Sequence, residues 1–253
     1  MGKTAALILA AGHGTRFGGE IPKQFLELSG KPLWQLSTEA FFPFADAIVI
    51  VTDKVHKDQV AAKVMKWTSG QFWDEAEKPH LFVTEGGDSR AESVLNGLRF
   101  LERISENESG DELPETVLIH DAARCLVTPE VIRECLMEAK LHGASVAAIP
   151  ATDTVKVAKA GEEGFPAVLH TPDRRTLYQV QTPQGFSFEW ILSAYTKAEE
   201  AGELGSLTDD ASAVERFSEH TVVLTPGSVE NIKVTRPLDL AFAESILRYR
   251  ILK

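Results

Sequence analysis

Short apolar runs alternate with amphipathic stretches of helical period along this chain, and that alternation constrains its fold more than any other feature. The apolar runs are strand-like in length and lie at residues 5–10, 47–51, 81–84, 117–120 and 144–149. The helical stretches lie at 33–42 and 56–67, after Ser89, and after Thr128-Pro129. Buried apolar strands separated by helices are typical of a parallel sheet that is covered on both faces. The sequence therefore predicts an α/β fold with a Rossmann-like, mostly parallel sheet and helices on both faces.

Two of the helix starts carry capping signals. Ser89 stands three residues before Glu92, which is the spacing of a capping box. Val94 and Leu98 then follow on one helical face. Pro129 comes directly after Thr128, where a proline suits the first helical position. Both helices are expected to begin at these points.

Residues 151–176 break the alternation. Two weakly alternating segments flank Gly161 to Gly164, which predicts a projecting β-hairpin. Such a hairpin must bury its apolar face elsewhere, and a second subunit is one candidate. A helix at 188–201, a strand at 222–224 and a helix at 237–250 follow. We expect one domain over residues 1–253, with 151–176 as a dimerisation arm.

Composition excludes several classes of partner. The chain has 253 residues and a formal net charge of −11, so its overall field repels nucleic acids and acidic membrane surfaces. Its first apolar run is too short to span a bilayer. Cys125 and Cys135 show neither metal-ligand spacing nor a disulfide framework. We expect a soluble cytoplasmic protein that binds neither nucleic acid nor membrane.

The strongest local signal is the segment 9–16, which follows the first apolar run. Gly12 and Gly14 allow the backbone to approach a ligand closely, and successive amides there can enclose phosphate oxygens. Ala10 and Ala11 leave room for a flat base or a ribose. A glycine-rich turn that only connects strand and helix is the alternative. Phe17 occupies the place of the third glycine of a dinucleotide fingerprint, which disfavours a dehydrogenase.

Two cations follow this segment. Arg16 can hold two phosphate oxygens in a fork, and Lys23 can neutralise charge that develops at phosphorus. Either residue alone would be read as a surface charge. Their position beside a loop rich in amides favours a triphosphate site.

Two polar clusters come at the ends of later strands, where α/β sheets place ligands. Gly87, Asp88, Arg90 and Ser93 follow the third apolar run, although a turn with a helix cap would also explain them. Asp121 leaves the fourth run. A buried carboxylate there needs a partner, and a Mg²⁺ ion bridging it to nucleotide phosphates would supply one.

The late motifs contain a further lysine and an acidic pair. Lys233 lies between Ile232 and Val234 in a strand-like run, so it needs an anion or a route to solvent. Thr208 precedes Asp209 and Asp210, a pattern that a helix cap alone could explain.

Together these segments resemble the 2-C-methyl-D-erythritol 4-phosphate cytidylyltransferases of the non-mevalonate isoprenoid pathway. The motifs stand in the family's order from about residue 6 to residue 243. The resemblance implies an enzyme that joins CTP to the polyol phosphate without a protein nucleophile and releases pyrophosphate. It also implies a divalent metal, Mg²⁺, and a homodimer that exchanges its arms.

The resemblance implies roles for individual residues. CTP would be bound by a set of small and polar residues: Ala10, Ala11, Gly12, Gly14, Gly87, Asp88, Arg90, Ser93, Asp121 and Ala122. The expected catalytic residues are Arg16, Lys23, Arg174 and Lys233, of which Arg16 and Lys23 stabilise the transition state. The polyol phosphate would be held by Thr154, Arg174, Thr182 and Lys233, with Arg174 serving the neighbouring subunit. Asp121 and Asp209 would hold the metal.

The chain departs from the family's pattern at three places. Cys125 stands where proline is frequent, Phe17 where methionine is, and Phe25 where tyrosine is. None of these positions takes part in the chemistry described above, so the resemblance is little weakened.

Two other functions remain open at this point. A ribitol-5-phosphate cytidylyltransferase would have the same fold and chemistry. Those relatives tend to have valine in place of Ala123 and Asp-Ala-Cys in place of Asp210-Ala211-Ser212, which favours methylerythritol phosphate here. A regulator that binds nucleotides without catalysis would be expected to have lost Lys23, Asp121 or Lys233, and all three are present.

The sequence predicts the effect of removing Lys23. We expect Lys23→Ala to remain folded and to lose turnover by roughly a hundredfold or more, because the lysine neutralises charge in the transition state. Steady-state kinetics together with circular dichroism measure both properties. Near-normal turnover would remove Lys23 from its role.

Overall fold

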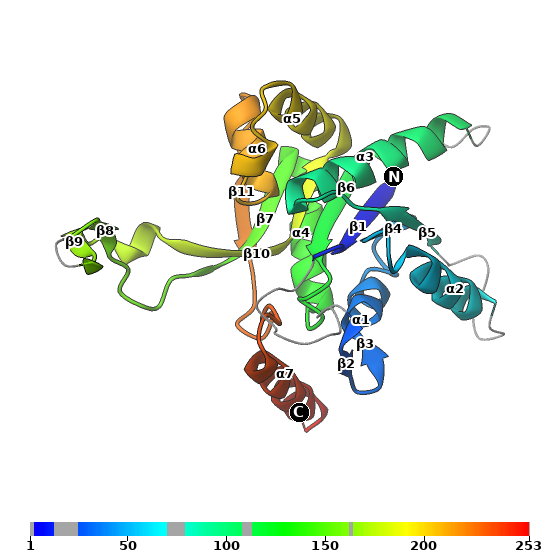
Figure 1. Cartoon of the computed structure of the whole chain (residues 1–253), viewed down its shortest axis with the longest axis horizontal. Helices are drawn as coiled ribbons and strands as arrows, with labels where there is room; N and C mark the ends of the chain where they lie inside the picture. Colours follow the sequence, from blue (N-terminus) through cyan, green and yellow to red (C-terminus); the bar gives the residue numbers. More distant parts are fainter. Residues whose placement is uncertain (1–2, 13–24, 70–78, 108–112, 162–163, 253) are drawn as a thin grey trace.

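The computed structural model describes residues 3–12, 25–69, 79–107, 113–161 and 164–252. Seven strands form the central sheet, in the order β11-β7-β10-β6-β1-β4-β5 (Figure 1). Their bounds are β1 Thr4–Ala10, β4 Ala47–Thr52, β5 His80–Glu85, β6 Thr116–Asp121, β7 Ala144–Pro150, β10 Tyr178–Ser187 and β11 Val223–Pro226. Strand β10 runs antiparallel to its neighbours β6 and β7, and the other pairings in this sheet are parallel. The predicted mostly parallel α/β sheet is confirmed.

Successive side chains of the central strand β1 pack on opposite faces of the sheet. Ala5 and Leu7 join one apolar cluster, whereas Ala6, Ile8 and Ala10 join the other. Because side chains alternate across a strand, both faces of β1 must be apolar when helices cover both. This is the physical reason for the unbroken apolar run at the start of the chain.

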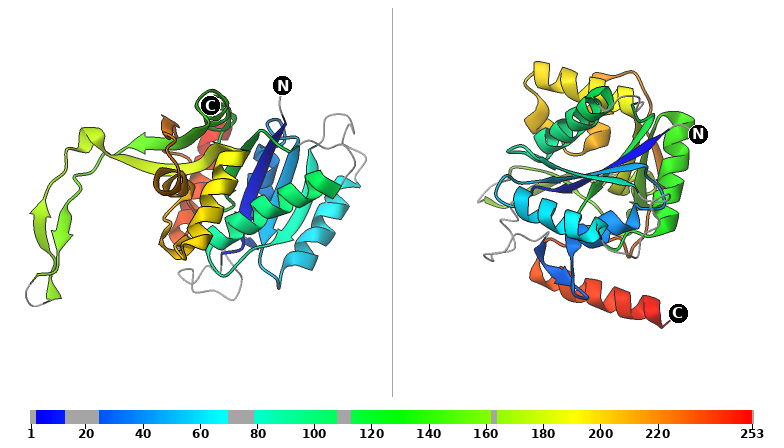
Figure 2. Two further views of the ribbon diagram at one scale, coloured as in Figure 1. Left: turned by 90° about the horizontal axis from the view of Figure 1, so that it is seen from above. Right: turned by 90° about the vertical axis from the view of Figure 1, so that its right-hand side faces the viewer.

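Helices cover both faces of the sheet, as Figure 2 shows. One layer consists of α3 (Arg90–Asn107), α5 (Phe188–Glu200) and α6 (Asp210–Phe217). The other consists of α1 (Leu33–Ala40), α2 (Lys57–Thr68) and α4 (Pro129–His142). The two short 3₁₀ helices are η4 (Arg174–Thr176) and η5 (Leu204–Ser206).

A third, smaller apolar cluster holds the last helix, α7 (Pro237–Ile251), against the small hairpin of β2 (Glu27–Leu28) and β3 (Lys31–Pro32). Leu28, Leu33 and Ala243 lie in this cluster. Cys125, where relatives often have proline, is buried in it as well. The cysteine therefore serves as a small apolar side chain.

Both predicted helix starts are confirmed. The Glu92 amide donates to Ser89 Oγ at 3.1 Å, and the Ser89 amide donates to Glu92 Oε2 at 3.3 Å, which completes a capping box. Helix α4 begins at Pro129 with Thr128 as its N-cap. It ends before Gly143, whose φ of 83° is left-handed and suits glycine.

The predicted hairpin is also present. Strands β8 (Val157–Lys159) and β9 (Ala167–His170) pair antiparallel at the far end of an arm that projects from the body (Figure 1). Phe165 is 76% exposed, and Val168 and Leu169 are exposed too. Exposed apolar side chains gathered on one element are typical of a surface that binds a partner. The role of residues 151–176 in dimerisation, and the single domain 1–253, stay predictions.

Three local expectations were incomplete or wrong. The sequence analysis did not identify β10, which contains a cis Thr182–Pro183 bond and a register shift between Val180 and Gln184. Asp209, not Thr208, caps α6, because its carboxylate accepts the Ser212 amide at 3.0 Å. Lys233 lies in an irregular segment instead of a strand. Among the described helices, none has the length and apolar character needed to cross a bilayer.

Candidate functional site

The order of the strands reverses beside β1. The chain runs from β1 outward to β4 and β5, and then returns to place β6 on the other side of β1. In sheets of this kind a crevice opens beyond the carboxyl ends of the strands at such a switch point. Ala10 ends β1 and Asp121 ends β6, so the two segments singled out by the sequence meet there.

A cleft of about 240 Å³ opens at this point. Its lining contains most of the residues predicted to bind nucleotide: Ala10, Ala11, Gly12, Gly87, Asp88, Arg90, Ser93 and Asp121. Ala122 is fully buried and does not line it. Gly14 lies outside the described residues. The structure thus brings eight of ten predicted residues into one cleft, and their binding of CTP stays a prediction.

Ser93 holds the glycine turn that forms one wall of this first cleft. Its hydroxyl donates to the carbonyl of Ser89 at 2.8 Å and accepts the Gly87 amide at 3.1 Å. A Cβ atom at Gly86 would come within 2.6 Å of both Ala11 Cβ and Ser93 Oγ. Only glycine allows the turn to pack this closely against the end of β1.

A second cleft, of about 520 Å³, adjoins the first. It shares Arg90, Asp121 and Lys233 with the first cleft. The rest of its lining is largely polar: Arg124, Tyr178, Val180, Gln181, Thr182, Gln184, Thr208, Asp209, Ser212 and Glu215. Two ligand-sized spaces therefore meet at one ionic group.

The shared ionic group is centred on Asp121. Arg90 Nε donates to Asp121 Oδ1 at 3.1 Å, and Lys233 Nζ lies 2.6 Å from Asp121 Oδ2. Burial by itself would raise the pKa of Asp121, but the charges of Arg90 and Lys233 outweigh it and hold that pKa well below its usual range. The carboxylate is therefore ionised, and the predicted need of Lys233 for an anion is met.

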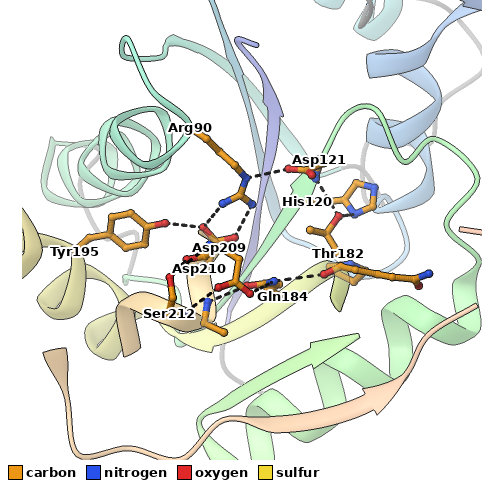
Figure 3. A network of polar contacts seen from close by, with 12 residues as sticks. Arg90, His120, Asp121, Thr182, Gln184, Tyr195, Asp209, Asp210 and Ser212 are labelled. Carbon is orange, nitrogen blue, oxygen red and sulfur yellow. Dashed lines mark hydrogen bonds and ion pairs between the residues drawn. The ribbon is translucent and has the colours of Figure 1, made fainter. Parts of the chain in front are cut away.

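Arg90 is itself held from below by a second carboxylate (Figure 3). Its Nη1 and Nη2 donate to the two oxygens of Asp210 at 2.8 and 2.7 Å, and the Tyr195 hydroxyl donates to Asp210 Oδ1 at 2.6 Å. Burial alone would lower the pKa of Arg90, yet Asp210 and Asp121 raise it well above its usual value. Burial and Asp210 together raise the pKa of Tyr195. Arg90 therefore stays positively charged, and its N–H groups point toward Asp121 and Asp210.

A chain of hydrogen bonds fixes the backbone at Asp121. The Asp121 amide donates to Thr182 Oγ1 at 3.1 Å, and Thr182 Oγ1 lies 2.9 Å from His120 Nδ1. His120 Nε2 lies 3.2 Å from the carbonyl of Arg124. A carbonyl can only accept, so Nε2 carries the ring proton and the Thr182 hydroxyl donates to Nδ1. Burial lowers the pKa of His120 to about 3, so the ring is neutral.

The remaining predicted residues divide into three groups. Thr182 lines the second cleft but is nearly buried, with its hydroxyl bonded as described above. Thr154 and Arg174 lie exposed on the arm, where Arg174 Nη1 donates to the Thr152 carbonyl at 3.1 Å. Neither lines either cleft of this chain. Arg16 and Lys23 lie outside the described residues.

Sequence reasoning missed Asp210 and Tyr195. Asp210 was explained as part of the first turn of a helix, and Tyr195 lies on the apolar face of α5. Both side chains are fully buried. A tyrosine on an otherwise apolar helix face needs a hydrogen-bond partner for its hydroxyl. That need could have identified Tyr195 from the sequence.

Asp121 and Asp209 are the carboxylates predicted to hold a divalent metal. Within the described parts of the chain, no group of three or more histidine, cysteine or acidic side chains could hold an ion. Asp121 and Asp209 nevertheless both line the second cleft. Mg²⁺ is usually held by one or two carboxylates together with substrate phosphates and water, so these side chains have suitable chemistry. Arg90 and Lys233 bind the two oxygens of Asp121, and Ser212 and Gln184 bind those of Asp209.

Comparison with known proteins decides the family. A family model described as IspD, 2-C-methyl-D-erythritol 4-phosphate cytidylyltransferase, matches residues 4–249. The chain belongs to this cytidylyltransferase family. The prediction made from the sequence is confirmed, both for the family and for the enzyme class, a nucleotidyltransferase.

Relatives that carry the family's name align with this chain over nearly its whole length. The enzyme of this name from Caldanaerobacter subterraneus subsp. tengcongensis is 38% identical over 96% of this chain and 98% of its own. That from Clostridium novyi is 38% identical over 98% and 97%. The crystal structure of 4-diphosphocytidyl-2C-methyl-D-erythritol synthase from Anaerococcus prevotii superposes with a TM-score of 0.75 at 26% identity, covering 98% of this chain and 99% of that one.

The neutral His120 predicts how stability depends on pH. Its pKa is about 3 in the folded chain and about 6.5 when unfolded, so the unfolded chain binds the extra proton between these values. Protonation of His120 therefore does not reduce the free energy of unfolding above about pH 6.5. As pH falls from there toward 3, that free energy decreases by up to about 1.4 kcal/mol per pH unit.

His120→Gln tests this dependence, because a glutamine amide can donate to the Arg124 carbonyl and accept from Thr182 without titrating. Urea unfolding at pH 7 and pH 5 should show a larger loss of unfolding free energy in the wild type than in the variant. Equal losses in the two proteins would contradict the assignment of a neutral, buried ring.

Proposed function

We propose that this cytidylyltransferase transfers the cytidylyl group of CTP to 2-C-methyl-D-erythritol 4-phosphate, giving 4-diphosphocytidyl-2-C-methyl-D-erythritol and pyrophosphate. One observation carries the proposal beyond family membership: two clefts of ligand size meet at Arg90, Asp121 and Lys233. A transfer between two phosphorylated molecules requires adjoining sites with cationic groups at their junction.

We assign CTP to the first cleft. Gly12 and Gly87 line this cleft and let the backbone come close to a nucleotide, and Ala10 and Ala11 leave room for the base and ribose. Ser93 keeps the Gly87 turn in place through the two hydrogen bonds described above. A turn fixed in this way would give the nucleotide a defined position.

The polyol phosphate is assigned to the second cleft, with Lys233 at the junction. Its phosphate oxygen attacks the α-phosphorus of CTP, forming a new P–O bond while the bond to the bridging oxygen of pyrophosphate breaks. Both reactants are anions, so their approach requires compensating positive charge. Lys233 reaches both clefts and can exchange its contact with Asp121 for one with a phosphate oxygen.

Arg16 and Lys23 complete the proposed charge set. They follow Gly12 in the chain and would stabilise charge on the transferring phosphoryl group and the leaving pyrophosphate. No protein nucleophile is needed in a direct displacement, and catalysis then depends on position and electrostatics.

A divalent cation, Mg²⁺, is part of the proposal. Asp121 and Asp209 would hold it together with nucleotide phosphates. When bound, it supplies positive charge to phosphate oxygens. The ionised state of Asp121 supports this role, because a metal ligand must be deprotonated.

We further propose a cytoplasmic homodimer with exchanged arms. Arg174 and Thr154 would complete the polyol site of the neighbouring subunit, since both are exposed and line neither cleft of their own chain. The exposed apolar residues of the arm, Phe165 among them, would be covered by that contact. Both cysteines are buried and free, which suits a reducing compartment.

Product analysis tests the reaction. The protein is incubated with each nucleoside triphosphate and methylerythritol phosphate in the presence of Mg²⁺, and the products are identified by mass. We expect a CDP-linked product and pyrophosphate with CTP only. A parallel assay with ribitol 5-phosphate tests the alternative substrate, and the absence of any pyrophosphate would favour a regulator without catalysis.

Complementation tests the exchanged arms. Arg174→Ala and Lys233→Ala should each be nearly inactive, because each removes a cation from every site. If Arg174 serves the partner's site, mixing and reassociating the two variants restores about a quarter of wild-type activity, since half of the dimers are mixed and each contains one intact site. A mixture no more active than its components would show that each arm serves its own chain.

A further inference from the structure

Arg90 uses three of its five N–H groups on two different carboxylates. Nε donates to Asp121, and Nη1 and Nη2 donate to both oxygens of Asp210 in a fork. A planar guanidinium bound at three points has little freedom to rotate. The direction in which Nε points toward Asp121 is therefore set by where Asp210 stands.

Asp210 is fully buried and is itself held in place. It is the first residue of α6, where the helix dipole favours a negative charge. Its Oδ1 accepts the hydroxyl of Tyr195, which is also fully buried and comes from α5. Helices α5 and α6 thus hold the Asp210 carboxylate against the guanidinium of Arg90 (Figure 3).

Neither residue lines a cleft, so direct contact with a ligand does not explain them. Asp210 and Tyr195 are absent from the linings of both clefts, whereas Arg90 lines both. A buried ion pair is costly to form and does not by itself make a fold more stable than apolar packing would. Its position below Arg90 therefore points to a role in placing that cation.

We propose that Asp210 and Tyr195 form a positioning pair that fixes the guanidinium of Arg90 and, through it, the carboxylate of Asp121. The inference rests on the proposed function, because it assigns the two residues a part in that reaction. Neither residue touches the reacting atoms. Their contact with the lining of the clefts is made through Arg90.

Kinetics of a double-mutant cycle test this dependence. Tyr195→Phe keeps the ring and removes one hydrogen bond, and should lower kcat roughly fivefold in the wild type, within the range of coupling inside one network. In an Arg90→Lys background the same substitution should change kcat by less than about twofold, because the fork that Asp210 positions is gone. Equal losses in both backgrounds would overturn the proposal.

The folded Asp210→Asn variant should lose more kcat than Tyr195→Phe. The amide can accept from Arg90 at only one atom, so the guanidinium loses its fork, and kcat should fall on the order of 100-fold. A matched control exists on the same helix, where Arg99 makes an exposed fork with Glu199 of α5. Glu199→Gln removes a comparable pair away from the clefts and should leave kcat unchanged.

A measurement without turnover separates this inference from the proposed function. Hydrogen exchange of the Arg90 Nε–H, followed by NMR and assigned by its loss in Arg90→Lys, should be slow in the wild type. Tyr195→Phe should accelerate it severalfold. Unchanged exchange would overturn the positioning pair even in an active enzyme. Failure of the wild type to form product would instead contradict the proposed function, while the exchange rates still decide the positioning.

Discussion

The carboxylate of Asp121 is ionised and nearly buried, and the site is organised around that charge. Such a group is destabilising unless cations and hydrogen-bond donors surround it. Here Arg90 binds one oxygen and Lys233 the other. Two cations from distant parts of the chain are thereby brought to one point, where the two clefts adjoin.

Each member of this group is held by its own local structure. Arg90 begins a helix fixed by the capping box of Ser89 and Glu92. Lys233 follows Asn231, whose side-chain amide donates to the Thr182 carbonyl at 2.9 Å, and precedes Val234, whose amide donates to the Ala123 carbonyl at 2.8 Å. The segments that carry the charges are therefore held by hydrogen bonds that involve the backbone.

The sequence predicted those features of the fold for which a sequence pattern has a single physical explanation. The parallel strands were predictable because burial on both faces demands unbroken apolar runs, as in β1. Because a charge in apolar surroundings needs a partner, the sequence predicted one for Asp121 and one for Lys233. The partner predicted for Asp121 was Mg²⁺, whereas in the structure Arg90 and Lys233 bind its oxygens. Strand β10 was not predictable, since its glutamines and Pro183 show no strand pattern, and its pairing with β6 and β7 determines its conformation. Asp210 was missed because its place in the first turn of a helix already explained it.

The central claim is that two ligands occupy two adjoining clefts and share one ionic junction. Titration of the labelled protein with CTP and, separately, with methylerythritol phosphate tests it most directly, with backbone amides followed by NMR. The account predicts that CTP shifts the amides of Gly12 and Gly87, that the polyol phosphate shifts those of Gln184 and Asp209, and that both shift Asp121. A CTP response confined to the second cleft, or an Asp121 amide unaffected by either ligand, would contradict it.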